Sequence, residues 1–89
     1  MIEGNSIIDA DVTIRPGARI TNSVIGRNCK IEEGARVVDS VIWAGTTLDA
    51  DSHVEGVILG KGCYVGRNAV LRPGVVLGDK TVVTDFSQL

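Results

Sequence analysis

The feature that most constrains this sequence is an aliphatic residue that recurs every five or six positions along the whole chain. Fifteen consecutive segments each begin with Ile, Leu or Val, although these three types supply only 27 of the 89 residues. The first residues of the segments are Ile2, Ile8, Ile14, Ile20, Ile25, Ile31, Val37, Ile42, Leu48, Val54, Leu59, Val65, Leu71, Leu77 and Val83. Such a repeat predicts an architecture in which each unit packs on its neighbours.

A second regularity marks the turns. Three residues after the aliphatic, the longer segments carry Gly, Asn or Asp, which adopt a positive φ more readily than other residues. These turn residues are Asn5, Asp11, Gly17, Asn28, Gly34, Gly45, Asp51, Gly62, Asn68 and Gly74. The last two segments instead have Lys80 and Phe86. Each segment therefore predicts a short strand closed by a tight turn, and we expect the segment from Lys80 to Leu89 to fold over the last coil as a lid.

The fourth residue after each aliphatic is small or short, with Ile58 as the exception, and we expect these side chains to fill the interior beside the aliphatics. They are Ser6, Val12, Ala18, Val24, Cys29, Ala35, Val41, Thr46, Ser52, Cys63, Ala69, Val75, Thr81 and Ser87. Cys29 and Cys63 fall in one interior column, two coils and roughly 9.6 Å apart, beyond the Cα separation of about 7 Å that a disulfide allows. We predict two buried, reduced thiols.

Three segments make one turn of the chain. Ile8, Ile25, Ile42, Leu59 and Leu77 are separated by 17, 17, 17 and 18 residues. We therefore predict one all-β domain over residues 1–89, a single-stranded parallel β-helix of about five triangular coils of 17–18 residues. An α-helix is excluded because a six-residue spacing scatters the aliphatics around the helix axis. Hairpins are excluded because their longer alternating runs and two-residue loops are missing.

Composition excludes several classes of partner. Nine basic and eleven acidic residues give a net charge of −2, which argues against a nucleic-acid-binding protein or a membrane-surface binder. The longest apolar run covers only residues 41–44, too short to cross a membrane. The first residues show no signal peptide. We expect a cytoplasmic protein.

No catalytic, cofactor-binding or metal-binding residue is assigned in this chain. One histidine, His53, and two separated cysteines do not make a zinc site or a catalytic triad. Arg19, Arg36 and His53 stack on one face, and Arg15, Glu32 and Asp49 lie beside them. Two interpretations stay open: a solvated ladder in which carboxylates offset the arginines, or an anion site formed by Arg19, Arg36 and His53.

Association is expected from the outward residues. Trp43 follows an inward aliphatic and should point outward between Gly26 and Gly60, where its ring either lies flat or fills a pocket of a partner. Outward positions near the C-terminal end are also apolar. The predicted interface residues are Trp43, Tyr64, Val70, Val76 and Val82. We expect a homo-oligomer, formed through a side face that contains Trp43 or through stacked N-terminal coils.

Over residues 2–83 the pattern resembles the hexapeptide repeat of left-handed β-helices, and the left hand of the coil is implied by that resemblance. Residues 20–26 (ITNSVIG) and 37–43 (VVDSVIW) resemble phrases in the C-terminal β-helix of sugar-1-phosphate nucleotidyltransferases, such as mannose-1-phosphate guanylyltransferases and glucose-1-phosphate adenylyltransferases. The resemblance implies the C-terminal part of a longer enzyme of nucleotide-sugar synthesis, which serves oligomerisation and regulation by an effector. Its partner would be its own N-terminal nucleotidyltransferase domain, which would hold the catalytic residues and Mg²⁺.

Two alternatives remain. The first is a fragment of a hexapeptide acyltransferase, or a carbonic anhydrase of the same class. These proteins need, respectively, a catalytic histidine and three zinc-binding histidines. The second is a purely structural assembly module, such as the related exchange-factor subunits of eukaryotic translation.

Overall fold

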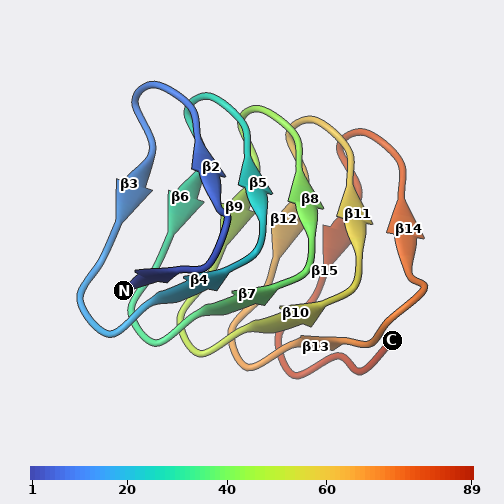
Figure 1. Ribbon diagram of the computed structural model, residues 1–89. Coiled ribbons are helices and arrows are strands. Elements are labelled where there is room, and N and C mark those ends of the chain that lie inside the picture. The colour runs from blue at the N-terminus through green and yellow to red at the C-terminus, as the bar shows by residue number, and fades with distance from the viewer.

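The computed structural model describes residues 1–89 as fifteen short strands wound into a triangular coil, without a helix (Figure 1). Sheet A consists of β1 (Ile2–Glu3), β4 (Arg19–Thr21), β7 (Arg36–Val38), β10 (His53–Glu55) and β13 (Val70–Leu71). Sheet B consists of β2 (Ile7–Ile8), β5 (Val24–Ile25), β8 (Val41–Ile42), β11 (Ile58–Leu59) and β14 (Val76–Leu77). Sheet C consists of β3 (Thr13–Ile14), β6 (Lys30–Ile31), β9 (Thr47–Leu48), β12 (Tyr64–Val65) and β15 (Val82–Val83). The structure contains no helix that could span a membrane.

The coil is left-handed. In Figure 1 the chain rises along sheet B at the front, crosses to sheet C at the back, descends, and returns through sheet A at the bottom while advancing from left to right. All strands pair in parallel, and the predicted column from Ile8 to Leu77 is in register throughout. The prediction of an all-β, left-handed parallel β-helix of five coils is confirmed.

The segment-initial aliphatics form the core. Most are completely buried in the three middle coils, whereas Ile2, Ile8 and Ile14 at one end and Leu77 at the other remain partly or fully exposed. A coil at an open end has a neighbour on one side only, so its aliphatics lose half of their packing. Cys29 and Cys63 are buried and unpaired, as predicted.

The turns follow the expected pattern with one exception. Nine of the ten predicted turn residues adopt a positive φ, and in the first coil Gly4 takes this conformation in place of Asn5. Lys80 and Phe86 also adopt a positive φ, of 60° and 62°. Backbone bonds from Lys80 to Lys61 and from Phe86 to Arg67 hold both turns on the preceding coil.

The expected C-terminal lid is wrong. β15 pairs with β12 in sheet C, and Gln88 bridges to Val70 in sheet A, so the last segment continues the coil. The side chain of Phe86 is exposed. The backbone hydrogen bonds to the preceding coil offset the preference of Lys80 and Phe86 for a negative φ.

A ladder of serine hydroxyls lies inside the corner between sheets A and B. The amide of Ser23 donates to Ser6 Oγ at 3.2 Å, that of Ser40 to Ser23 Oγ at 3.1 Å, and that of Val57 to Ser40 Oγ at 3.2 Å. Ser40 Oγ itself donates to the carbonyl of Val38 at 2.7 Å. Each hydroxyl therefore satisfies one amide and one carbonyl that the corner leaves out of the strand ladder.

A second interior column contains the two cysteines. Cys29 Sγ donates to the carbonyl of Trp43 at 3.1 Å, and Cys63 Sγ donates to that of Gly78 at 3.1 Å. Between them, Thr46 Oγ1 donates to the carbonyl of Gly60 at 2.9 Å. Burial raises the pKa of the Cys29 thiol. The thiols thus occupy the same structural position as a threonine hydroxyl.

Two buried serines should respond in opposite ways to replacement by alanine. Ser40→Ala leaves the amide of Val57 without its acceptor, and we expect a loss of roughly 1–3 kcal/mol in the free energy of unfolding. Ser52 Oγ is buried without a hydrogen-bond partner, so Ser52→Ala should be neutral or stabilising by up to about 1 kcal/mol. Urea unfolding of both variants measures this. Equal losses would contradict the assigned hydrogen bonds.

Candidate functional site

The outward side of sheet B is aliphatic in every coil. Its five outward side chains are between 36% and 67% exposed, and all belong to Ile or Val. They are Ile7, Val24, Val41, Ile58 and Val76, which we call the aliphatic face. Contiguous exposed apolar surface marks interaction sites in soluble proteins. This face is therefore the candidate functional site.

Three residues of the aliphatic face, Val24, Val41 and Ile58, end the five-residue segments. We expected Val24 and Val41 to fill the interior, and this is wrong, because Ser23, Ser40 and Val57 are the buried residues. In these segments the residue with positive φ comes two positions after the aliphatic, at Asn22, Asp39 and Gly56, instead of three. Neighbouring side chains in a strand point to opposite faces, so a shift of one position turns the valine outward.

Trp43 lies at one edge of the aliphatic face. It follows β8 directly, is 52% exposed, and borders an open hollow of about 360 Å³. The hollow is lined by Asp9, Val24, Gly26, Arg27, Val41, Ile42, Trp43, Ala44 and Lys61. A Cβ at Gly26 would lie 2.7 Å from the amide nitrogen of Ala44, so only glycine fits beneath the edge of the hollow.

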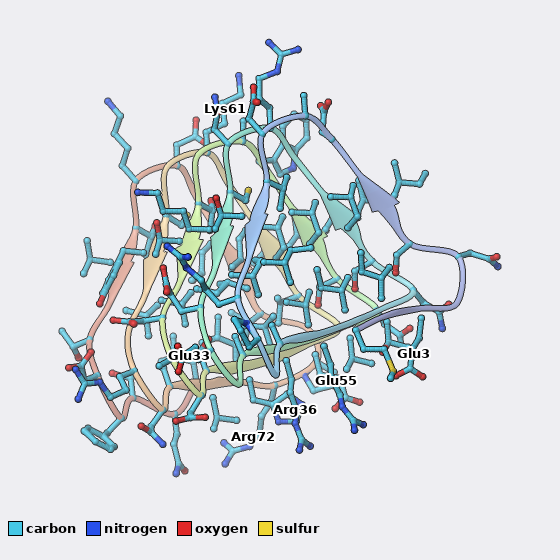
Figure 2. The ribbon with its side chains drawn as sticks, turned by 90° about the vertical axis from the view of Figure 1, so that its left-hand side faces the viewer. Glu3, Glu33, Arg36, Glu55, Lys61 and Arg72 are labelled. Atoms are coloured by element: carbon cyan, nitrogen blue, oxygen red, sulfur yellow. The ribbon has the colours of Figure 1, made fainter.

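Charged residues flank this edge. Arg27 and Lys61 lie in the turns between sheets B and C, one coil before and one coil after Trp43. Figure 2 shows Lys61 projecting from this corner. Asp39 lies at the opposite edge of the face, in the turn between β7 and β8. The chain contains two ion pairs, Arg15–Glu32 and His53–Glu55, so these three charges are unpaired within it.

The structure divides the predicted interface residues among all three sides. Trp43 and Val76 lie on the sheet B side, Tyr64 and Val82 on sheet C, and Val70 on sheet A. The residues that sequence reasoning missed are Ile7, Val24, Val41 and Ile58. The sequence did contain a signal for these residues. Each directly precedes one of the inward aliphatics that are spaced 17 residues apart, and neighbouring side chains in a strand point to opposite faces.

Arg19, Arg36 and His53 stack in register on sheet A, as expected. Arg19 and Arg36 have no carboxylate partner, whereas His53 Nε2 lies 3.9 Å from Glu55 Oε1. Figure 2 shows Arg36, Glu55 and Arg72 projecting together from this side of the molecule. Arg15 Nε lies 3.8 Å from Glu32 Oε1 at the adjoining corner. The face mixes both signs of charge. No group of three or more His, Cys, Asp or Glu side chains could hold a metal ion.

Sheet C carries a hydrogen bond between the side chains of Tyr64 and Asp49. The Tyr64 hydroxyl donates to Asp49 Oδ2 at 2.5 Å, and the amide of Ala50 donates to Asp49 Oδ1 at 2.7 Å. The tyrosine bond is the main cause that lowers the pKa of the Asp49 carboxyl below its ordinary value. The same bond raises the pKa of the Tyr64 hydroxyl. Both shifts favour the carboxylate–phenol pair at neutral pH.

Replacing Tyr64 should change the pH dependence of stability. Asp49 has a lowered pKa in the folded state, so its contribution is present above the unfolded pKa and is lost as the pH falls through the folded pKa. In Tyr64→Phe we expect the Asp49 pKa to rise toward its ordinary value, measured by NMR titration of the carboxyl carbon. In an Asp49→Asn background the same change should leave the acid limb of the stability profile unaltered. An unshifted Asp49 would contradict this assignment.

The comparison with known families covers the whole chain. Residues 1–89 match the family described as the EIF2B subunit epsilon LbH domain, in which LbH denotes a left-handed β-helix. The chain belongs to this family. The resemblance to the left-handed β-helix domains of sugar-1-phosphate nucleotidyltransferases is thereby confirmed at the level of the β-helix domain.

Relatives and solved structures agree with this assignment. The bifunctional protein GlmU of Nitratidesulfovibrio vulgaris strain DP4 is 38% identical over 103 residues, covering 99% of this chain and 23% of that protein. GlmU of Pseudomonas putida strain F1 is 33% identical over 89 residues, covering 100% and 16%. The chain thus spans less than a quarter of these curated relatives.

A solved structure shows the same fold. A GDP-perosamine N-acetyl transferase mutant from Caulobacter crescentus, in complex with CoA and GDP-perosamine, superposes with a TM-score of 0.74 at 26% identity. The match covers 94% of this chain and 44% of that protein. The hexapeptide-repeat architecture is therefore shared with transferases.

Proposed function

We propose that this chain is the β-helix module of a sugar-1-phosphate nucleotidyltransferase and that it holds copies of the protein together without performing chemistry. The family match and the GlmU relatives, which align along almost all of the chain, support a module of this kind. The proposal has three further parts. The module also serves regulation by an effector, it is joined to an N-terminal nucleotidyltransferase domain that binds Mg²⁺, and the protein is cytoplasmic.

The aliphatic face carries the proposal of association. Sheet A presents mostly charged side chains outward, with Val70 in the last coil, and sheet C presents Thr13, Lys30, Thr47, Tyr64 and Val82. Sheet B presents aliphatic carbon in all five coils. Each square ångström of apolar surface removed from water contributes about 25 cal/mol. Covering this face by a partner therefore removes more apolar surface from water than covering either of the two other sides.

Association should be visible in solution. Sedimentation of the purified chain at micromolar concentration is expected to show a species heavier than the 9.4 kDa monomer. Val41→Lys places a charge at the centre of the aliphatic face and should give monomers, because an unpaired charge is costly to bury. Thr47→Lys, at the outward position of sheet C in the same coil, is the control and should associate normally. A wild-type monomer would refute the proposal.

An acyltransferase is the second candidate function. It is favoured by the fold shared with the Caulobacter N-acetyl transferase and by the pairing of the single histidine, His53, with Glu55. A histidine beside a carboxylate is a common general base. Our proposal places no active site in this chain, so His53 is assigned a surface role.

Activity measurements distinguish the two candidates. We expect the purified 89-residue chain to transfer neither a nucleotidyl group from a nucleoside triphosphate to a sugar 1-phosphate nor an acetyl group from acetyl-CoA to an amino sugar. Acetyl transfer that is lost in His53→Ala, while Arg36→Ala keeps it, would favour the acyltransferase. Arg36 is the control because it lies beside His53 in the same outward column.

A further inference from the structure

The two edges of the aliphatic face differ in charge around its middle strand. β8 is the middle strand of sheet B, with Asp39 before it and Trp43 after it. Arg27 and Lys61 lie beyond the neighbouring strands β5 and β11, on the same edge as Trp43. One edge is therefore acidic at the middle coil, and the other is basic one coil to either side. In the two terminal coils that second edge carries Asp9 and Asp79. None of the charges on Asp39, Arg27 and Lys61 is neutralised within the chain.

This charge pattern distinguishes two ways in which identical faces can meet. A dimer interface is isologous, so its two-fold axis lies in the plane between the two sheets. If the axis runs across the coils, β5 of one copy meets β11 of the other and like edges coincide, which places Arg27 against Lys61. If the axis runs along the coil axis, each strand meets its own counterpart and opposite edges coincide. Asp39 of one copy then faces the edge that carries Arg27 and Lys61.

We propose that the aliphatic faces of two copies pack together with their coil axes parallel, so that Asp39 of each copy lies between Arg27 and Lys61 of the other. This inference rests on the proposed role in association and adds the partner, the orientation and the residues that select it. Stacked sheets lie about 10 Å apart and neighbouring coils about 4.8 Å apart, so both basic side chains can reach the carboxylate from their own coils. Charges at the rim of an interface select the orientation and suppress wrong pairings.

A dimer interface of standard size would use most of one side of the prism. The chain exposes 4846 Å² in total over three sides and two ends, and each partner of a standard interface buries roughly 800 Å². Trp43 would lie against the Asp39 edge of the other copy, where its exposed ring becomes covered. Large aromatics at such positions often dominate the binding energy.

The test reverses the charges at the two edges. Sedimentation of the wild type should give a dimer. Asp39→Lys should raise the dimer dissociation constant by roughly tenfold or more, because it places three cations together at each edge. Asp39→Lys combined with Arg27→Asp and Lys61→Asp should restore association. With the axis across the coils, Asp39→Lys would have no effect on the dissociation constant. Residue 39 would then face residue 39 of the other copy, so like charges would meet there both before and after the substitution.

Two further variants distinguish a loss of association from a loss of folding. Asp51→Lys is the matched control, because Asp51 has a φ of 58° in the same coil but lies at the corner remote from sheet B. It should leave the dimer intact. Asp39→Asn removes only the charge, and asparagine suits the turn, since Asn22 holds the equivalent position one coil earlier. It should weaken the dimer in proportion to the lost attraction, and far less at high salt.

The outcomes separate this inference from the proposed function. A wild-type monomer would overturn both. A dimer that Val41→Lys disrupts but Asp39→Lys leaves unchanged would keep the proposed function and overturn the parallel arrangement. A trimer, or a dimer insensitive to both variants, would overturn the arrangement as well.

Discussion

The ladder of hydrogen bonds between successive coils is the constraint on which the rest of this structure depends. It forces a residue and the residue 17 or 18 positions later into the same place on neighbouring coils, as in the paired column of Ile25, Ile42 and Leu59. A position in the coil thereby becomes a column along the molecule. The ladder is strong enough to hold Lys80 and Phe86 in a left-handed conformation that their side chains disfavour. Turn chemistry of the right kind is therefore helpful in most coils but not required in each one.

Once positions are stacked, the chemistry of each column is repeated and its effects add. Ser23 and Ser40 pass hydrogen bonds from coil to coil inside one corner. Cys29, Thr46 and Cys63 donate to corner carbonyls inside another. These columns satisfy backbone groups that a corner leaves unpaired, which explains how a chain with only three aromatic residues builds an ordered interior. Ser52 is the exception, since its hydroxyl has no partner between the alanine side chains of its column.

Outside, the same stacking gives the three sides of the prism different properties. The outward positions of sheet A are mostly arginine, histidine and glutamate, and those of sheet C are mixed, whereas the outward positions of the sheet B strands are all aliphatic. The charges at the edges of sheet B distinguish the orientations in which two such aliphatic faces can pack, which the aliphatic side chains alone do not. A module built in this way needs no cleft to recognise a partner, because a periodic face supplies the area and the charges at its edges set the orientation.

The sequence by itself determined the periodic part of this protein: the strand and turn repeat, the parallel register, the buried aliphatics and the unpaired thiols. These follow from local preferences, such as a positive φ at Asn28 and Gly45, repeated until only a coil fits. Tertiary structure alone decided which side chains point outward in the five-residue segments. Val24 and Ser23 are adjacent, and pairing with the next coil turns one to water and the other to the interior. It also decided that the predicted interface residues would lie on three sides and that residues 80–89 would continue the coil. The physical reason is that local chemistry tells the chain where it can turn, whereas the neighbouring coil determines which way each side chain faces after the turn.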